Sequence, residues 1–167
     1  APPHEVRILG GLWKRSKLPV ADRPGLRPTP SRVRETLFNW LGQDLTGWRC
    51  IDAFAGTGAL GFEAASRGAT DVVLVDSDAA LVAQLQATRT RLKADAVRVQ
   101  RGDALAALRE RAGQGLDVVF LDPPFDAEAV FAPALAAARA AVRDEGFVYL
   151  EAPRPYTDAD VEIGRAH

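Results

Sequence analysis

The clearest pattern along the chain is an alternation of short aliphatic runs with longer stretches rich in alanine and leucine. The short runs are the length of strands, and the stretches between them have helical spacing. From residue 49 onward we expect strands at 49–54, 71–75, 96–100, 117–121 and 146–151, and helices at 59–67, 78–93, 103–112 and 127–142. This alternation predicts an α/β fold with a doubly wound, mostly parallel sheet that helices cover on both faces.

The first 45 residues interrupt this pattern. Residues 6–28 contain several glycines and prolines and few periodic apolar positions, which is typical of irregular structure. A helix should follow, with Thr29 as N-cap, Pro30 as first helical residue and an apolar stripe of Val33, Leu37, Trp40 and Leu41. We expect one compact unit, in which an arm and helix over 1–45 pack on a main domain over 46–167.

Composition narrows the chemistry that is available. Cys50 is the single cysteine, and the two histidines stand at positions 4 and 167, so neither an internal disulfide nor a His/Cys metal site is expected. No stretch approaches the roughly 20 apolar residues that span a bilayer, and the first residues lack an apolar secretion core. We therefore expect chemistry based on carboxylates, backbone groups and an organic cofactor, with no metal and no membrane partner.

Charge is unevenly distributed, although the net charge is only −1. Residues 1–35 carry eight basic and three acidic side chains, whereas the remainder carries 13 basic and 19 acidic ones. A basic arm on an acidic body is suited to a nucleic-acid backbone, although a solvated charged segment has the same composition. The candidates for contact with RNA are Arg15, Lys17, Arg27, Arg32 and Arg34.

A glycine-rich motif, Asp52-Ala53-Phe54-Ala55-Gly56-Thr57-Gly58, ends the first strand of the alternation and opens the next helix. Such glycines allow a ligand to approach the backbone, but a nicotinamide dinucleotide site would have them too. Asp76 ends the second strand, where a carboxylate can accept both ribose hydroxyls of an adenosine. Asp52 favours S-adenosylmethionine, because a carboxylate repels a pyrophosphate but pairs with an ammonium group. A loop-bracing aspartate is the alternative.

A second motif, Asp122-Pro123-Pro124-Phe125, follows the strand at 117–121 and should face the glycine loop. Asp122 and a backbone carbonyl of the turn can accept the two N–H bonds of a base's exocyclic amine, which aims the nitrogen lone pair at a methyl donor. The prolines stiffen the turn, and Phe125 offers a face for stacking a base. Alone, the motif could be a plain turn. Together with the glycine loop, it predicts a methyltransferase that acts on a nucleobase amine.

Two further acidic residues lie near these motifs. Asp103 follows the third strand, where it can accept the adenine amine of the cofactor and also cap the next helix. Glu63, in the first helix of the alternation, is expected to be solvated or to cap a helix. The predicted cofactor site comprises Asp52, Phe54, Gly56, Gly58, Asp76, Asp103 and Ala104.

The N-terminal stretch resembles the bacterial RsmD family, whose members methylate guanine N2 in 16S rRNA. The resemblance rests on four motifs in the same order, namely Gly10-Gly11, Lys17-Leu18-Pro19, Gly25-Leu26-Arg27-Pro28-Thr29 and residues 32–41, and it extends over residues 7–151. It implies a seven-stranded Rossmann-like fold of class I methyltransferases, S-adenosylmethionine as cofactor and a cytoplasmic location. It also implies 16S rRNA in the 30S subunit or an assembly intermediate as partner, with no obligate protein partner.

The same resemblance assigns roles to segments of this chain. Asp122 to Phe125 would form the catalytic turn, and residues 25–29 and 32–34 would meet RNA or close over the cofactor. Two departures are notable. Asp76 stands where the family often has Glu, and only one short strand is evident at 161–164, which puts the antiparallel edge of the sheet in doubt.

Alternative functions remain at this stage. An adenine-N6 methyltransferase of DNA or RNA would use the same catalytic turn, although no separate domain for target recognition is evident. A nicotinamide oxidoreductase is disfavoured by Asp52. A catalytically silent RNA-binding assembly factor would keep the fold, but none of the motifs is degraded.

Overall fold

The body of the protein is a six-stranded sheet in a computed structural model that describes residues 5–21, 26, 28–123, 128–151 and 161–165. The strand order is β5-β4-β3-β6-β7-β8. Neighbouring strands run parallel from β5 to β7, and β8 is antiparallel to β7. The strands are β3 (Arg49–Asp52), β4 (Asp71–Asp76), β5 (Val97–Arg101), β6 (Leu116–Leu121), β7 (Val142–Glu151) and β8 (Val161–Arg165).

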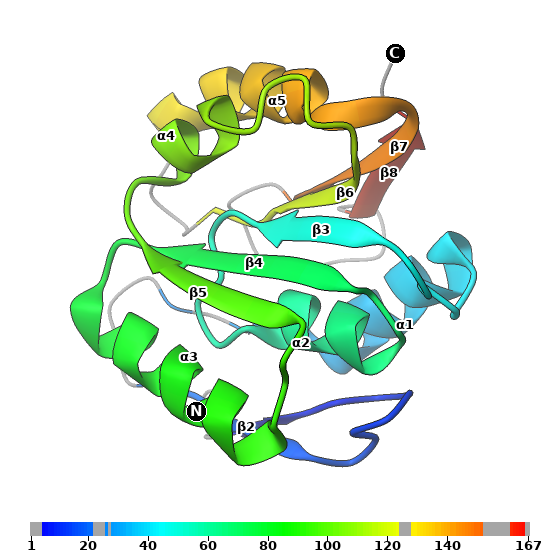
Figure 1. Ribbon diagram of the computed structural model, residues 1–167, viewed down its shortest axis with the longest axis vertical. Coiled ribbons are helices and arrows are strands. Elements are labelled where there is room, and N and C mark those ends of the chain that lie inside the picture. The colour runs from blue at the N-terminus through cyan, green and yellow to red at the C-terminus, as the bar shows by residue number, and fades with distance from the viewer. Residues whose placement is uncertain (1–4, 22–25, 27, 124–127, 152–160, 166–167) are drawn as a thin grey trace.

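Helices cover both faces of this sheet, as Figure 1 shows. One face carries α4 (Ala104–Arg109) and α5 (Glu128–Ala141), and the other carries α1 (Ser31–Leu41), α2 (Ala59–Ser66) and α3 (Ala79–Leu92). Each face has its own core, because successive strand residues point to opposite sides. Cys50 is buried in the core under α1 and α2, and Ile51 in the core under α4 and α5.

The predicted α/β fold is confirmed, with elements that start and end within a few residues of their predicted bounds. The edge of the sheet differs from the expectation. Within the described residues the sheet has six strands, not the seven that the resemblance implied. Its antiparallel edge is nevertheless present, since β8 pairs with β7 from Val161 opposite Glu151 to Arg165 opposite Phe147.

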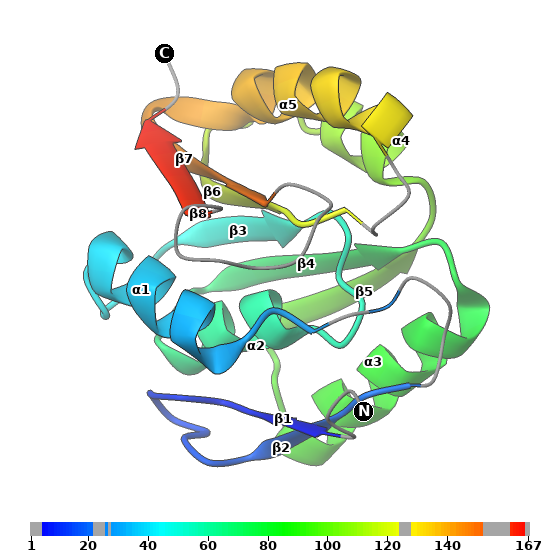
Figure 2. The ribbon, with the colours of Figure 1, turned by 180° about the vertical axis from the view of Figure 1, so that it is seen from behind.

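The N-terminal segment contains a hairpin where irregular structure was predicted. Strand β1 (Glu5–Arg7) pairs antiparallel with β2 (Lys17–Pro19), below α2 and α3 in Figure 2. The backbone N–H groups of Leu12 and Trp13 donate to the carbonyl and the hydroxyl of Ser66, at 2.8 and 2.9 Å. The prediction of irregular structure missed these two strands, because strands of three residues are too short to show a two-residue period.

Helix α1 begins one residue later than predicted, and its buried stripe differs from the predicted one at Trp40. Its N-cap is Pro30, without a side-chain cap bond, so the prediction of Thr29 as N-cap was wrong. The buried positions are Val33, Arg34, Leu37, Phe38 and Leu41. Trp40 is 49% exposed instead of buried, with its ring edge against Phe147 at 5.1 Å between centroids.

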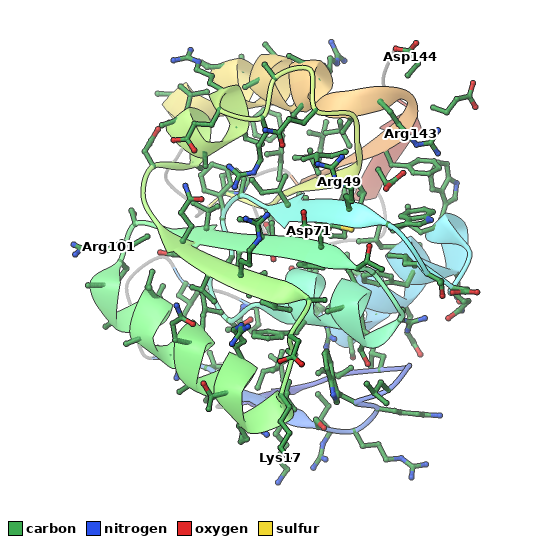
Figure 3. The ribbon with its side chains drawn as sticks, viewed as in Figure 1. Lys17, Arg49, Asp71, Arg101, Arg143 and Asp144 are labelled. Atoms are coloured by element: carbon green, nitrogen blue, oxygen red, sulfur yellow. The ribbon has the colours of Figure 1, made fainter. Side chains whose placement is uncertain are left out.

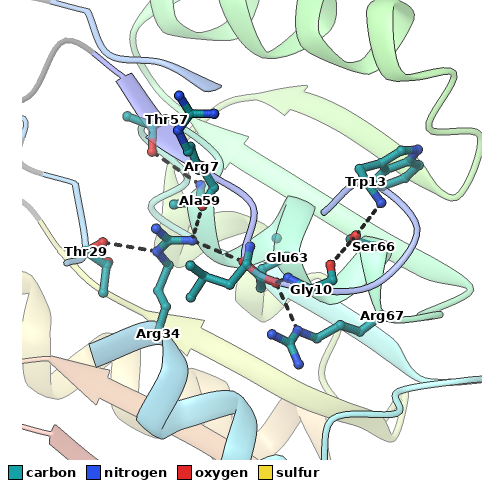
Figure 4. Close-up of polar contacts among 12 residues, drawn as sticks. Arg7, Gly10, Trp13, Thr29, Arg34, Thr57, Ala59, Glu63, Ser66 and Arg67 are labelled. Atoms are coloured by element: carbon teal, nitrogen blue, oxygen red, sulfur yellow. Dashed lines mark hydrogen bonds and ion pairs between the residues drawn. The ribbon is translucent and has the colours of Figure 1, made fainter. Parts of the chain in front are cut away.

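Helix α2 is buried along its whole length, and a carboxylate lies in the middle of it. Glu63 is completely buried, so the prediction that it is solvated or caps a helix was wrong. One carboxylate oxygen accepts from Leu9 N at 2.9 Å and the Arg34 guanidinium at 3.1 Å. The other accepts from Gly10 N at 3.0 Å and from Arg67 Nε at 2.9 Å (Figure 4). Four donors therefore compensate the burial of one charge.

Arg34 joins this carboxylate to the segment before α1. Its guanidinium also donates to the carbonyl of Arg7 at 2.9 Å and, through Nε, to the carbonyl of Thr29 at 3.2 Å. The side chain is 2% exposed, and burial lowers the pKa of its guanidinium, an effect that Glu63 opposes. The prediction that Arg34 contacts RNA was therefore wrong, because its charge lies inside the protein and is directed at internal acceptors.

No helix within the described ranges is long and apolar enough to cross a bilayer.

Removing Arg34 should strongly destabilise the fold. Arg34→Ala would leave the Glu63 carboxylate buried with one cation fewer, and breaking such a pair typically costs about 3–5 kcal/mol. Arg32→Ala, at an exposed position of the same helix, should cost at most about 1 kcal/mol. Urea unfolding followed by circular dichroism measures both values, and equal costs would show that the buried network does not support the fold.

Candidate active site at the carboxyl edge of the sheet

A pocket of about 290 Å³ lies at the carboxyl ends of the parallel strands. Its wall contains eight of the residues predicted from the sequence, namely Asp52, Phe54, Gly56, Asp76, Asp103, Ala104, Asp122 and Pro123. The pocket thus joins the predicted cofactor residues and the first half of the predicted catalytic turn. Pro124 and Phe125 of that turn, and Arg27, lie outside the described residues.

Asp52 is the most deeply buried carboxylate of the pocket. Its side chain is at the end of β3, with an overall exposure of 1%, and one oxygen accepts from the backbone N–H of Gly61 at 3.1 Å. The other oxygen, Oδ1, has no hydrogen-bond partner among the described residues. Burial, and to a lesser degree Asp122, raises the pKa of Asp52 to about 8. A buried acceptor at a pocket wall with a raised pKa is suited to a cationic donor.

The glycine loop depends on Asp76 for its shape. One carboxylate oxygen accepts from Gly56 N at 3.0 Å, and the other accepts from Asp78 N at 2.9 Å. Asp76 therefore fixes the loop after β3 to the end of β4, and it also lines the pocket. A role as a loop brace is thus compatible with a role toward a ligand.

Two glycines of the loop are required for different reasons. Gly58 does not line the pocket but caps α2 with a left-handed backbone, at φ 81°, where a Cβ would lie 2.6 Å from Phe62. A Cβ on Gly61 would lie 2.0 Å from Leu74, so only glycine lets α2 approach β4 so closely. The motif therefore positions α2 as well as the loop.

Asp103 has the capping role that was predicted for it. Its carboxylate accepts from Ala106 N at 2.8 Å at the start of α4, and its side chain remains exposed. Ala104, the first residue of α4, is buried beside it in the pocket wall. Leu81 adds an apolar part of the wall that the motifs did not predict, and Leu26 comes from the segment 25–29, which was expected to meet RNA or close over the cofactor.

Asp122 is held by a hydrogen bond that could not be predicted from the sequence. The hydroxyl of Thr29 donates to Oδ2 of Asp122 at 2.7 Å, and both residues line the pocket. Pro123 follows as a buried residue. The predicted catalytic carboxylate is thus bonded to the segment that enters α1, 93 positions away in the chain.

Acidic residues at the ends of four adjacent strands share one face of the sheet. Asp52 is in register with Leu74 of β4 and Phe120 of β6, each two residues before Asp76 and Asp122. Phe120 is in turn opposite Tyr149, two residues before Glu151 of β7. Because side chains alternate along a strand, all four carboxylates lie on the α1–α3 face. Glu151 is fully buried and accepts from the Tyr149 hydroxyl at 2.7 Å.

The predicted RNA-binding residues that the structure describes are not part of the pocket wall. Arg15 and Lys17 are exposed on the hairpin, and Figure 3 shows Lys17 pointing away from the sheet. Arg32 is exposed on the first turn of α1. Within the described ranges, no group of His, Cys, Asp and Glu side chains is arranged to hold a metal ion.

Comparisons with known proteins agree with this arrangement. The family model described as "Conserved hypothetical protein 95" matches residues 6–163. "Ribosomal RNA small subunit methyltransferase D" of Escherichia coli K12 is 49% identical over 121 residues, which are 72% of this chain and 61% of that protein. The protein of the same name from Haemophilus influenzae is 47% identical over 124 residues, 72% and 64% of the two chains. This chain thus spans less than two thirds of their length.

A solved structure gives the same relationship in three dimensions. The yhhF protein of Escherichia coli superposes with a TM-score of 0.76 at 37% sequence identity, over 89% of this chain and 80% of that one. This similarity confirms the Rossmann-like fold. Since the family model covers nearly the whole sequence and the relatives share about half of the aligned residues, the chain belongs to the RsmD family that its motifs resemble.

Proposed function

We propose that this protein transfers a methyl group from S-adenosylmethionine to the exocyclic N2 amine of a guanine in 16S rRNA. The observation that carries the proposal is the pocket whose wall contains both Asp52 and Asp122. The names of the curated relatives support ribosomal RNA of the small subunit as the substrate class. The 30S subunit or an assembly intermediate in the cytoplasm would present this RNA.

The residues of the pocket fit S-adenosylmethionine. Oδ1 of Asp52 would accept from the methionine ammonium, and Asp76 would accept from the ribose hydroxyls. Asp103 and Ala104 would lie beside the adenine, whose flat apolar faces match Leu81 and Phe54. When bound, S-adenosylmethionine supplies an electrophilic methyl group on a sulfonium centre, so no metal is needed for the chemistry.

Asp122 would prepare the nitrogen of the acceptor. The lone pair of an exocyclic amine is delocalised into the ring, and a hydrogen bond from the N–H to a carboxylate draws it back toward the nitrogen. As the new N–C bond forms and the C–S bond breaks, the nitrogen must lose a proton. Asp122 is placed to accept this proton or to pass it to water, because it lines the pocket and is partly exposed.

Binding of S-adenosylmethionine should strengthen as the pH rises from 6 to 7.5. With a pKa of about 8, Asp52 is mostly neutral in the free protein over this range, whereas an ammonium partner requires its ionised form. Binding must therefore release a proton, and the affinity should rise by up to about tenfold per pH unit. Calorimetry at several pH values measures this slope, and NAD should give no signal.

The control is Asp52→Asn, which should abolish the slope and cost about 1.5–3 kcal/mol of binding free energy at pH 7.5. If the wild-type affinity does not depend on pH, Asp52 is not the partner of the ammonium group. Tight binding of NAD without binding of S-adenosylmethionine would contradict the assignment of the cofactor.

Asp122 should matter for chemistry and not for cofactor binding. Asp122→Ala removes the acceptor and should slow single-turnover methyl transfer by about 10²–10³-fold, whereas Asp122→Asn keeps an oxygen and should retain part of the activity. In a strain that lacks the gene, the wild-type copy should restore one N2-methylguanosine in 16S rRNA and the Ala variant should not. Mass-spectrometric mapping detects this modified nucleotide, and an N6-methyladenosine product would instead show that adenine is the target base.

The exposed cations of the hairpin should control the salt dependence of RNA binding. Replacing Arg15 and Lys17 with Ala should flatten the plot of log affinity against log salt by about 0.7 for each phosphate that is no longer neutralised. A matched control replaces Arg109 and Arg139, two exposed arginines on the opposite face of the sheet. Equal slopes for the two double variants, measured by filter binding, would show that the hairpin does not face RNA.

A further inference from the structure

We propose that Thr29 is a positioning residue, whose hydroxyl orients the carboxylate of Asp122 toward the methyl acceptor. The inference rests on the proposed function and names a residue outside the predicted catalytic turn. Thr29 lines the pocket, is 4% exposed, and donates to Oδ2 of Asp122 at 2.7 Å. A short hydrogen bond to a carboxylate is among the stronger polar contacts in proteins, and it fixes the carboxylate plane as well as its position.

The direction of this hydroxyl is informative, because a local alternative exists. A threonine just before a helix commonly caps it, and such a cap is worth about 1 kcal/mol. Helix α1 instead has Pro30 as N-cap and no side-chain cap bond. The Thr29 hydroxyl is thus directed away from its own helix and toward Asp122. Thr29 therefore lies one position before the N-cap, and its hydroxyl makes a bond in the pocket.

The backbone of Thr29 is itself held by a buried side chain. Its carbonyl accepts from Nε of Arg34 at 3.2 Å, and the Arg34 guanidinium is held by Glu63 at 3.1 Å (Figure 4). Arg34 and Glu63 are almost completely buried. A continuous chain of contacts therefore leads from the middle of α2 through Arg34 and Thr29 to Asp122. The hydroxyl has a defined place from which to orient the carboxylate.

The hydroxyl also acts on the charge of the pocket. Asp52 and Asp122 are close enough for Asp122 to raise the pKa of Asp52, so the two carboxyl groups disfavour each other's ionised form. A donor bonded to one of them favours the negative charge on that one. Thr29 donates to Asp122, the group that must accept from the target amine. The same contact therefore supports the orientation of Asp122 and its role as an acceptor.

The test compares variants of the whole chain that differ by single groups. Thr29→Val keeps the shape but removes the donor, and Thr29→Ser restores the donor. Thr90→Val makes the same change at an exposed site of α3. We expect Thr29→Val to slow single-turnover methyl transfer to 16S rRNA by about 10–100-fold, the usual effect of removing a supporting group behind a functional one. Thr29→Ser and Thr90→Val should both stay within about threefold of wild type.

A double-mutant cycle separates positioning from a general loss of structure. In the Asp122→Ala background, Thr29→Val should have no further effect on the rate, because there is no carboxylate left to orient. Calorimetry should show affinities for S-adenosylmethionine within about threefold of wild type. A wild-type rate for Thr29→Val, no rescue by Thr29→Ser, or additive effects with Asp122→Ala would each overturn the inference. A wild-type protein that transfers no methyl group would overturn the proposed function instead, and this inference with it.

Discussion

The rest of the structure depends on the hydrogen bonds and ion pairs that the buried carboxylate of Glu63 accepts. It lies in the middle of a helix with no exposed face, so its charge must be compensated inside the protein. The compensation comes from α1 through Arg34, from the end of α2 through Arg67, and from the hairpin through the N–H groups of Leu9 and Gly10. One side chain thereby joins three segments of the chain, and displacement of any of them would remove at least one donor from a buried charge.

The pocket depends on the same network. Helix α2 begins at the glycine loop, and Arg34 holds the segment whose Thr29 contacts Asp122. The glycine loop and Asp122, on two sides of the pocket, are thus both connected to the buried ion pair of Arg34 and Glu63. This arrangement explains how a small domain can fix polar groups from β3, β4 and β6 around one cavity. Polar groups that are fixed in place can stabilise a reacting group without having to reorient during the reaction.

The sequence predicted the sheet, the helices and eight residues of the pocket wall, because periodicity and glycine placement are local signals. It did not predict the partners of buried charges, because those are set by contacts between distant segments. Arg34 was predicted to contact RNA, although its spacing from Leu37, Phe38 and Leu41 places it on the buried stripe of α1. Glu63 was predicted to be solvated, although every neighbour from Ala59 to Ala65 is apolar. In both cases the neighbouring residues in the sequence indicated burial, whereas no local pattern indicated the contact between Thr29 and Asp122.

The row of acidic strand ends has a consequence for what can enter the pocket. Asp76, Asp52, Asp122 and Glu151 follow one another along one edge, and the negative potential of those that are ionised is unfavourable for a phosphate. Cations and uncharged rings meet no such barrier. If the acceptor is a base of RNA, as we propose, this edge would admit the uncharged ring and keep its phosphates outside the pocket. The proposed reaction would then require a nucleotide whose base is turned out of the strand, and the electrostatics of the edge would favour an extruded base before any contact reads its identity.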